Sequence, residues 1–315
     1  MHESGQGDGQ QRAVVTILLG AFNGARYLPE QLQSIAIQSW PNWQILASDD
    51  GSSDETPKIL QDFARTHPLS IMAGPGQGLV RNFMHLLQAL PDAPPHVAFC
   101  DQDDVWLPEK LETALEHLRR VPEGCPALYC SRRLIWDPER GSRTASRAYP
   151  HPPSFANALI ENIAPGNTIV LNPAAAALAR DLAGTGGDVF AHDWWLYLLI
   201  AGVGGQVIYD PEPRLLYRQH AGNVIGAGEQ LSRQIGNKRA VWRGAFADRV
   251  GGNIAAMQAV VRHLTPENAR RLELLAQARA ARLPRRLALL RRAGVWRQGR
   301  LSGATFWGAA CLGKV

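Results

Sequence analysis

Hydrophobic and polar positions in the first third of the chain alternate between two patterns, one typical of buried strands and one typical of helices. Short apolar runs rich in β-branched residues predict strands at 14–19, 43–48, 69–73 and 96–100. Between them, apolar residues three or four positions apart predict helices at 27–38, from Ser53 or Asp54 to about Arg65, and at 79–90. Strands and helices that alternate with short connections predict an α/β fold, in which helices cover both faces of a mostly parallel sheet.

The pattern becomes less regular beyond residue 127. Further strands are predicted at 128–136, 167–171, 206–209 and 215–218, and further helices at 173–182 and 192–200. No internal repeat occurs, and after Gly228 the strand signals stop and the sequence is helical and rich in arginine. We therefore expect three regions: a disordered leader at 1–12, an α/β domain at 13–228 and a helical C-terminal region at 229–315.

The distribution of charge divides the chain at the same place. The 315 residues carry a mild net charge of +5. Residues 1–228, however, hold 16 basic and 24 acidic side chains, whereas residues 229–315 hold 17 and 4, so the two regions have net charges of −8 and +13. The acidic body should bind a cation, and the basic end should bind an anionic partner.

Composition narrows the class of protein and its compartment. With 45% hydrophobic and 19% charged residues, the chain is neither a disordered polyelectrolyte nor a collagen-like fibre. Its four cysteines lack zinc-site spacing and are expected to be free thiols in a reducing compartment. The N-terminus lacks a signal-peptide pattern, and the longest apolar runs are shorter than the ~18–20 residues of a membrane span. We expect a cytoplasmic protein whose contact with a membrane is peripheral.

Acidic clusters follow two of the predicted strands. Asp49-Asp50-Gly51-Ser52-Ser53-Asp54 ends the second strand and either presents carboxylates to a base or ribose or forms a capped turn. Asp101-Gln102-Asp103-Asp104 ends the fourth strand, and its three carboxylates repel one another unless a cation lies between them. Such hard oxygen ligands suit Mg²⁺ or Mn²⁺ bridging to substrate phosphates, and a solvated acidic loop is the alternative. Because parallel strands end at one edge of a sheet, both clusters should open onto one crevice.

Two later clusters carry further candidate chemistry. In Ala191-His192-Asp193-Trp194-Trp195, an acid beside two Trp residues would act as a general base in a partly apolar wall, or else cap a helix. In Tyr217-Arg218-Gln219-His220, the Arg would clamp phosphate oxygens and the His would complete a metal shell, or the two would form an ordinary surface pair. The glycine-rich segments match neither GxGxxG nor a P-loop, and no GxSxG occurs, so these nucleotide-binding and hydrolase motifs are excluded.

The order and spacing of these motifs resemble one known family. The blocks VVTILLGAFNG, ASDDGSSDET, GLVRN, DQDDVW, HDWW and YRQH follow one another as they do in glycosyltransferase family 2, most closely in its bacterial rhamnosyltransferase-like branch. The resemblance covers residues 13–228 without a large gap. It implies a GT-A fold, with the helical basic region as a C-terminal extension, and an inverting transferase that uses a nucleotide-diphospho-sugar.

The resemblance also implies roles for individual residues. The residues that would bind the nucleotide sugar are Ala21, Asn23, Asp49, Asp50, Arg81, Asp101 and Arg218. Divalent metal, Mg²⁺ or Mn²⁺, would be held by Asp101, Asp103 and His220, with Asp103 as the direct ligand. Asp193 matches the catalytic base. Many relatives carry Glu-Asp at this position, whereas this chain has His192 before the base.

Candidate contacts to acceptor or sugar lie beside these residues. They are Asp104, Trp106, His192, Trp194 and Trp195. The Trp rings would stack on sugars and exclude water, and core packing is the plainer alternative. A single displacement, with Asp193 taking the proton of the acceptor hydroxyl, predicts inversion without a second nucleophilic carboxylate.

The resemblance leaves the substrates open. The first expectation for the donor is dTDP-rhamnose, with UDP-hexoses and UDP-N-acetylhexosamines as alternatives. The acceptor would be a lipid-linked or oligosaccharide chain in the synthesis of cell-surface polysaccharide, such as O-antigen or capsule. Other classes to weigh are a sugar nucleotidyltransferase and a non-catalytic sugar-nucleotide-binding scaffold at the membrane.

The C-terminal region predicts a contact with an anionic membrane surface. Residues 270–300 contain ten Arg and one acid, and Leu283, Leu287 and Leu290 fall at helical spacing. The apolar stretch 301–313, which contains Phe306 and Trp307, follows them. The alternatives are packing within the protein or a dimer and nucleic-acid binding, and we expect no nucleic-acid partner. On the membrane interpretation, a chain that ends near Gly228 should stay soluble.

Overall fold

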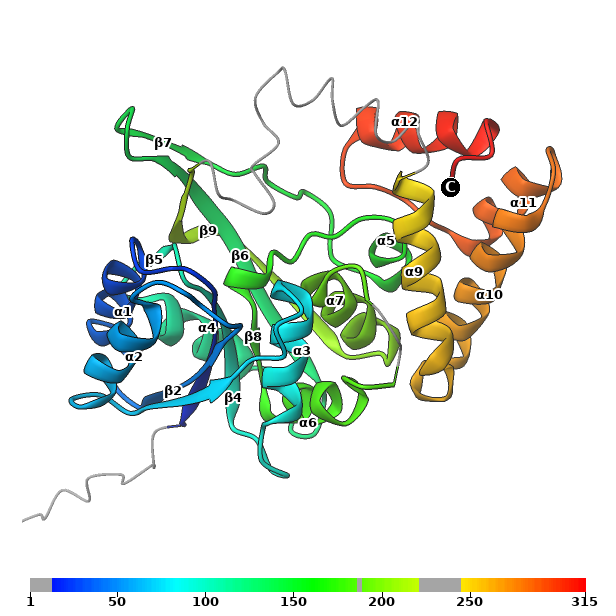
Figure 1. The fold of residues 1–315 in the computed structure, drawn as a ribbon. Helices are drawn as coiled ribbons and strands as arrows, with labels where there is room; N and C mark the ends of the chain where they lie inside the picture. The colour runs from blue at the N-terminus through cyan, green and yellow to red at the C-terminus, as the bar shows by residue number, and fades with distance from the viewer. Residues whose placement is uncertain (1–12, 186–188, 221–244) are drawn as a thin grey trace, which may run out of the picture.

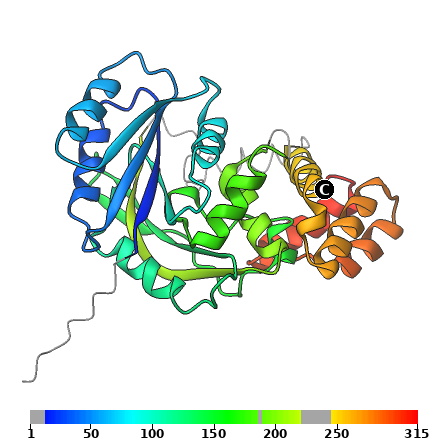
Figure 2. The same ribbon diagram turned by 90° about the horizontal axis from the view of Figure 1, so that it is seen from below.

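The computed structural model describes residues 13–185, 189–220 and 245–315 (Figure 1). The predicted leader at 1–12 and the predicted boundary at 228/229 lie outside these ranges. Within them, an α/β body is followed by a group of helices at one end, as Figure 2 shows from below.

One nine-stranded sheet forms the centre of the body. Its order is β3-β2-β1-β4-β8-β6-β9-β5, with β7 paired to β6. The strands are β1 (Val15–Ala21), β2 (Trp43–Asp49), β3 (Leu69–Ala73), β4 (His96–Asp101), β5 (Val105–Trp106), β6 (Ala127–Asp137), β7 (Ser142–Ala145), β8 (Val170–Leu171) and β9 (Gln206–Arg218). The first four strands run parallel, as predicted, and β6 pairs with β9 in parallel. The other pairs are antiparallel, so the second half of the sheet is mixed.

Helices cover both faces of the sheet, and each face has its own core. One core joins β1 to α1 (Leu28–Ala36), α2 (Thr56–Ala64) and α4 (Lys110–Leu118). The other joins it to α3 (Leu79–Gln88), α5 (Phe155–Ala158), α6 (Pro173–Leu182) and α7 (His192–Gly202). All seven residues of β1 are buried, which explains its unbroken apolar sequence.

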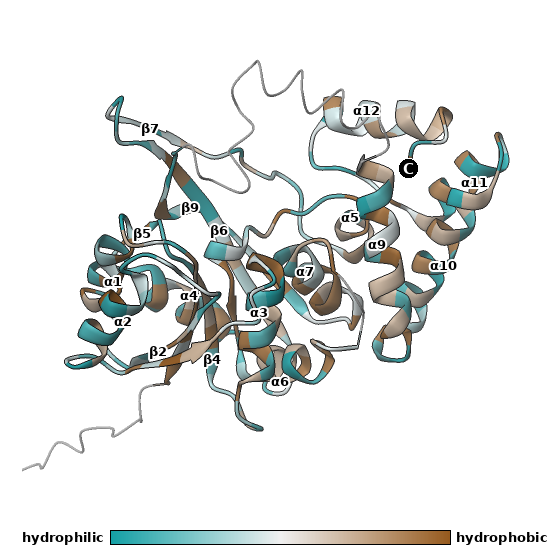
Figure 3. Cartoon of the chain, viewed as in Figure 1, coloured by the Kyte–Doolittle hydropathy of each residue, from teal (hydrophilic) through white to brown (hydrophobic). Residues whose placement is uncertain are grey.

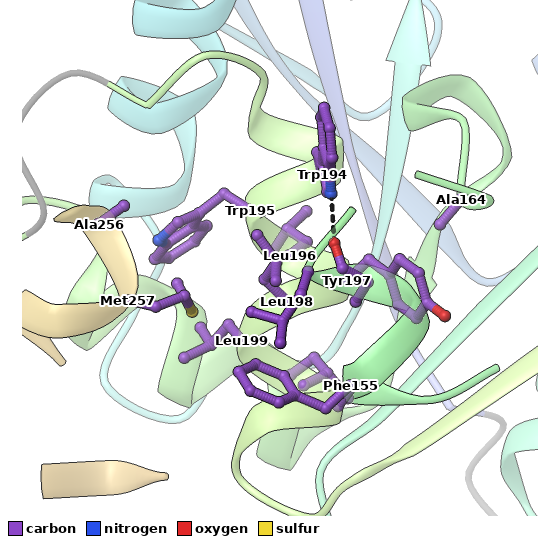
Figure 4. Close-up of a cluster of buried hydrophobic side chains, with 14 of the residues drawn as sticks. Phe155, Ala164, Trp194, Trp195, Leu196, Tyr197, Leu198, Leu199, Ala256 and Met257 are labelled. Carbon is purple, nitrogen blue, oxygen red and sulfur yellow. Dashed lines mark hydrogen bonds between the residues drawn. The ribbon is translucent and has the colours of Figure 1, made fainter. Parts of the chain in front are cut away.

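The C-terminal helices extend the second core. They are α9 (Ala245–Ala259), α10 (Pro266–Ala280), α11 (Arg285–Ala293) and α12 (Arg300–Cys311), with short 3-10 turns at Gly166–Thr168 (η1) and Val261–His263 (η2). Figure 4 shows Ala256 and Met257 of α9 beside Trp195 and Leu199 of α7. The helices of the tail and the helices of the body therefore bury their apolar faces against one another.

Polar contacts fasten this layer to the body. Gly202, the last residue of α7, accepts hydrogen bonds at its carbonyl from the Thr265 amide (3.0 Å) and from Asn268 Nδ2 (3.0 Å). Between α11 and α12, the Gln298 amide donates to the buried Glu161 carboxylate (2.6 Å) and the Gln298 side chain pairs with the backbone of His151. α10 thus satisfies carbonyl groups that would otherwise be unpaired at the end of α7.

The predicted leucine stripe of the tail is wrong in part. Leu283 lies outside α11, because Pro284 precedes the helix, and its side chain is exposed. Leu287 and Leu290 do lie on α11, but they pack into the core of the protein. For these two residues the structure shows packing within the protein, which was the alternative to membrane contact. In the described residues, every helix is too short or too polar to cross a membrane.

Candidate active site

The first polar site lies where β1 and β2 end. Ala21 pairs in register with Asp49, and Asn23 follows in the left-handed region with φ of 48°. The Asn23 amide donates to Ser52 Oγ (2.8 Å), and Asn23 Oδ1 accepts from the Ser53 amide (2.8 Å). Ser52 Oγ in turn donates to Asp49 Oδ1 (2.5 Å). The structure therefore brings together the residues expected to contact the nucleotide in these two loops.

Asp50 anchors the loop that precedes α3. Its buried carboxylate accepts hydrogen bonds from the amides of Gly76 and Gly78, both at 2.7 Å. Both glycines have positive φ, which a residue with a side chain rarely adopts. Arg81 follows, exposed, in the first turn of α3. The sequence analysis noted this glycine-rich segment but did not connect its three alternating glycines to Asp50.

Gln102 connects the acidic loop after β4 to the loop after β1. Its Nε2 donates to the Phe22 carbonyl (2.9 Å), and its Oε1 accepts from the Phe22 amide (2.8 Å). This paired hydrogen bond fixes the DQDD segment against the end of β1. The sequence analysis assigned no role to Gln102.

Carboxylates converge at the end of β4. Asp103 Oδ2 lies 2.9 Å from His220 Nε2, so these two predicted metal-binding residues are in contact. Burial and the nearby carboxylates of Asp103 and Asp193 raise the pKa of Asp101 to about 7. A pKa this high indicates an acidic pocket that a cation would stabilise.

Arg218 supports this pocket from behind. Its Nε donates to the Asp103 carbonyl (2.9 Å), and its Nη2 pairs with Glu30 Oε2 (2.5 Å). Its guanidinium lies over the rings of Trp136 (4.3 Å) and Tyr27 (4.9 Å), and the side chain is almost fully buried. The guanidinium thus contacts the backbone of the acidic loop and the Glu30 carboxylate, and a phosphate clamp by Arg218 stays a prediction.

Tyr27 holds His220 as well, since their rings lie 4.6 Å apart. Sequence reasoning missed Tyr27, Glu30 and Trp136. No local motif marks them, because they act only after the chain has folded around Arg218 and His220.

Asp104 and Trp106 point into the protein. Asp104 is fully buried and accepts a hydrogen bond from Asn167 Nδ2 (2.6 Å), and burial raises its pKa well above the ordinary range. Trp106 is 1% exposed and lies under the Lys110 ammonium, with Nζ 3.7 Å from the ring centroid. Burial lowers the pKa of Lys110 to about 8. The prediction that Asp104 and Trp106 contact acceptor or sugar is wrong, because neither is accessible here.

Asp193 stands at the first turn of α7, where the helix dipole favours a negative charge. Its Oδ2 accepts a hydrogen bond from the Gly166 amide (3.2 Å), and its Oδ1 accepts one from the Trp194 amide (2.7 Å). The carboxylate is therefore held by two backbone amides and lies near Asp101, whose pKa it raises.

His192 is buried beside this carboxylate. Its ring stacks on Phe83 (4.3 Å) and Phe99 (5.6 Å), and within the described ranges neither ring nitrogen has a hydrogen-bond partner. Burial lowers the pKa of His192, against the opposing effect of Asp193. A neutral imidazole in an apolar slot does not contact acceptor, so that prediction is wrong for His192.

Trp194 and Trp195 are part of the second core. They are 7% and 1% exposed, and Trp194 Nε1 donates to the Ala158 carbonyl (2.7 Å). Figure 4 shows both rings among other buried side chains. Their predicted stacking on sugars is wrong, and core packing, the stated alternative, is what the structure shows.

The fold and the site together define a class of protein. A sheet of this topology, with carboxylates gathered at the end of β4 and at the start of α7, is the GT-A fold of glycosyltransferases. The chain belongs to glycosyl transferase family 2, whose family model matches residues 16–185. The protein is therefore a transferase, as the resemblance implied.

Curated relatives agree with this assignment. The chain is 26% identical over 236 residues to the dTDP-rhamnosyl transferase RfbG of Shigella flexneri, a match that covers 71% of this chain and 80% of that protein. It is 26% identical over 241 residues to an uncharacterised protein of Mycobacterium tuberculosis (strain ATCC 25618 / H37Rv). That match covers 75% of this chain and 62% of that protein.

A solved structure shows the same fold over almost the whole chain. The mannosyltransferase PcManGT from Pyrobaculum calidifontis, in complex with GDP-Man and Mn²⁺, has a TM-score of 0.53 and 20% identity. The match covers 97% of this chain and 86% of that chain. The structural likeness thus extends past the family model and into the C-terminal helices.

Proposed function

We propose that the protein transfers a sugar with inversion from a nucleotide-diphospho-sugar to an acceptor hydroxyl. The observation that carries the proposal is the convergence of Asp101, Asp103 and Asp193 from two elements that are distant in sequence. Burial, together with the two neighbouring carboxylates, raises the pKa of Asp101 to about 7. One carboxylate at the start of α7 suits a single base, and a direct displacement needs no other.

The residues at the end of β4 fit a divalent cation. Within the described ranges, three or more His, Cys, Asp or Glu side chains are nowhere clustered as a complete metal site. Asp103 and His220 are nevertheless in contact, Asp101 is close, and two carboxylates with an imidazole are suitable donors for Mg²⁺ or Mn²⁺. Donor phosphates would complete such a shell. When bound, the cation would offset charge on the departing nucleoside diphosphate.

Asp193 is proposed as the general base. Its carboxylate would take the proton from the acceptor hydroxyl as that oxygen attacks the anomeric carbon. The amides of Gly166 and Trp194 orient it, so that its position does not depend on the substrate. The buried His192 closes the space behind it.

The donor is proposed to occupy the loops after β1 and β2. Ala21, Asn23, Asp49 and Asp50 would surround the nucleotide, and the exposed Arg81 would face it or the diphosphate. The match to a dTDP-rhamnosyl transferase supports dTDP-rhamnose. UDP-hexoses or UDP-N-acetylhexosamines remain the alternative, because another structure of this fold, S. aureus TarS 1-349 in complex with UDP-GlcNAc (TM-score 0.53, 14% identity, 90% of this chain and 92% of that chain), is similar.

The acceptor is proposed to be a lipid-linked or oligosaccharide chain of a cell-surface polysaccharide such as O-antigen. A peripheral position on the inner face of the cell membrane would bring the enzyme to such a lipid. Family membership disfavours a sugar nucleotidyltransferase. The presence of both Asp103 and Asp193 disfavours a non-catalytic scaffold.

The experiment compares Asp193→Asn with the surface variant Asp62→Asn. Thermal shift with dTDP-rhamnose and UDP-sugars, each with and without Mn²⁺, identifies the donor, and product analysis measures transfer. Asp193→Asn should keep the donor-induced shift and lose transfer by roughly 10²- to 10⁴-fold, because only the base is removed. Asp62→Asn should retain both. Full transfer by Asp193→Asn would remove this residue from the role of base.

A further inference from the structure

The outer face of α12 is apolar and exposed. The helix packs into the core through Phe306 and Ala310. Its opposite side carries residues at i, i+3, i+4 and i+7, which fall on one face of a helix: Leu301, Ala304, Thr305 and Gly308. Leu312, the residue that directly follows the helix, continues this spacing. Leu301 is 79% exposed and Leu312 is 56% exposed. No charged residue occurs between Arg300 and Lys314.

Positive charge lies beside α12. Residues 245–315 contain 13 Lys or Arg and 3 Asp or Glu. Five of these arginines are exposed and form no ion pair with any other described residue: Arg282, Arg285, Arg291, Arg292 and Arg300. Arg291 lies over the Trp307 ring of α12 at 5.8 Å, and Arg286 donates to the Ala310 carbonyl (3.1 Å). The basic residues of α11 are therefore fixed beside α12.

The figures place α12 at an edge of the C-terminal helix group. In Figure 1 the helix runs along the upper side of that group, with α11 next to it. In the hydropathy view, α12 is mostly white to brown, whereas α11 beside it carries hydrophilic residues (Figure 3). The exposed face of α12 is thus the side opposite Phe306 and Ala310, which pack into the core.

We infer that the outer face of α12 is a docking surface for an anionic lipid bilayer. Leu301 and Leu312 would enter the boundary between headgroups and acyl chains, while the neighbouring arginines bind lipid phosphates. The inference deepens the proposed function. It rests on that function for the lipid-linked acceptor, which the enzyme would meet at the bilayer. It also relocates the expected contact, because Leu290, assigned to the membrane from sequence, is buried in the protein, and Leu287 is partly buried against the same core.

Charge favours a bilayer over a second copy of the chain. Pairing of two α12 faces would bring two surfaces of like charge together, each from a region with an excess of ten positive charges. An anionic bilayer satisfies the arginines and the leucines at once. A nucleic acid would satisfy the arginines and leave Leu301 and Leu312 in water.

The test measures binding of the full chain to vesicles by co-sedimentation. The vesicles are phosphatidylcholine alone or phosphatidylcholine with about one third phosphatidylglycerol. The parent protein should bind the anionic vesicles only. Leu301→Asp with Leu312→Asp should weaken binding at least roughly tenfold, because two charges enter the apolar strip. The matched control, Ile37→Asp with Ile71→Asp, adds the same charge at exposed isoleucines of the body and should bind as the parent does.

Three results would overturn the inference. The first is equal binding by the two double variants, and the second is binding to neutral vesicles alone. The third is that the α12 substitutions leave vesicle binding intact and instead abolish a concentration-dependent dimer or the binding of duplex DNA. Transfer to a water-soluble acceptor separates this test from the proposed function. Loss of vesicle binding with full soluble transfer would leave the proposed enzyme activity intact.

Discussion

The backbone at Gly166 leaves no room for a side chain, because His192 lies against it. A Cβ atom at this position would stand 2.7 Å from His192 Nε2. The amide of the same residue donates to Asp193 Oδ2 at 3.2 Å. Gly166 therefore contacts both the buried His192 ring and the Asp193 carboxylate. The packing of His192 against Gly166 helps to fix the position of the proposed base.

Gly166→Ala should impair transfer more than it impairs donor binding. The added methyl group must displace either the His192 ring or the amide that holds Asp193, and such overpacking costs roughly 1–3 kcal/mol of stability. We expect kcat to fall at least roughly tenfold with a smaller change in the donor KM. Steady-state kinetics and urea unfolding check both effects.

Gly252→Ala is the matched control for this substitution. A Cβ atom at Gly252 in α9 meets nothing within 4 Å, so alanine should leave kcat unchanged and stabilise the helix by about 0.5–1 kcal/mol. A Gly166→Ala enzyme with normal kcat would show that the contact with His192 does not position the base.

At the scale of single residues, the sequence predicted which residues lie close together better than it predicted which way their side chains point. The family resemblance assigned Asp103 and His220 to one site, and in the structure the two side chains are in contact. It could not tell that Arg218 and the two Trp residues of α7 face inward. Arg and Trp suit both a binding cleft and a packed interior, and only the tertiary neighbours decide between the two.

At the scale of elements, β4 makes the stability of the fold depend on pH. His96 begins this strand, and burial, with a contribution from Arg119, lowers its pKa to about 4. Between pH 4 and its ordinary pKa, the unfolded chain binds the proton that the folded chain rejects. The folded state is therefore favoured above this window and loses stability as pH falls through it.

His96→Gln should reduce the loss of stability on acidification. For a shift of this size, the parent should lose roughly 2 kcal/mol between pH 7 and pH 5 through His96 alone, and the variant should not. Urea unfolding at both pH values measures the difference. At about pH 8 the imidazole is neutral in both states, so unfolding there isolates the effect of the side chain itself. Parallel curves for the two proteins would refute the assignment.

The elements that sequence predicted best are the first four strands. β1 to β4 appear within two residues of their expected bounds, because each is a short apolar run flanked by turn or helix signals. β9 was expected as two strands, since Pro211 and Pro213 suggest a break. Instead, a register shift opposite Ser131 and Arg132 absorbs the prolines within one strand. β5 and β7 were missed because two or four residues show no periodicity.

For the molecule as a whole, the tail and the body form one packed unit. Sequence predicted the change of charge and the helices but not this packing, because α9 and α10 show their fit only against α7. Trp195 and Leu199 of α7 lie beside Met257 of α9, and α10 caps the end of α7. The earlier expectation of a soluble fragment at 1–228 takes no account of these contacts.

A chain that ends at residue 228 should aggregate. Removing α9 to α12 exposes the buried side chains of α5 and α7, and a large apolar patch on a soluble domain favours association. The soluble fraction and the elution volume on gel filtration measure the outcome. A chain that ends at residue 298 keeps α9, α10 and α11 on the body and is the comparison, expected to be more soluble than the chain that ends at residue 228. A monomeric, folded 1–228 fragment would contradict the prediction.

The rigid attachment of α7 has one further consequence, which concerns the distance between the proposed base and the membrane surface. The helix is 11 residues long, about 16 Å, with Asp193 held at its start and Gly202 fastened to α10 at its end. If α12 rests on a bilayer, the base then stands at a fixed height above the lipid. Such an enzyme would select acceptors by the distance between the acceptor hydroxyl and the lipid that holds the acceptor in the bilayer. Synthetic acceptors with spacers of graded length would reveal this as a single optimum, and a flat response would exclude it.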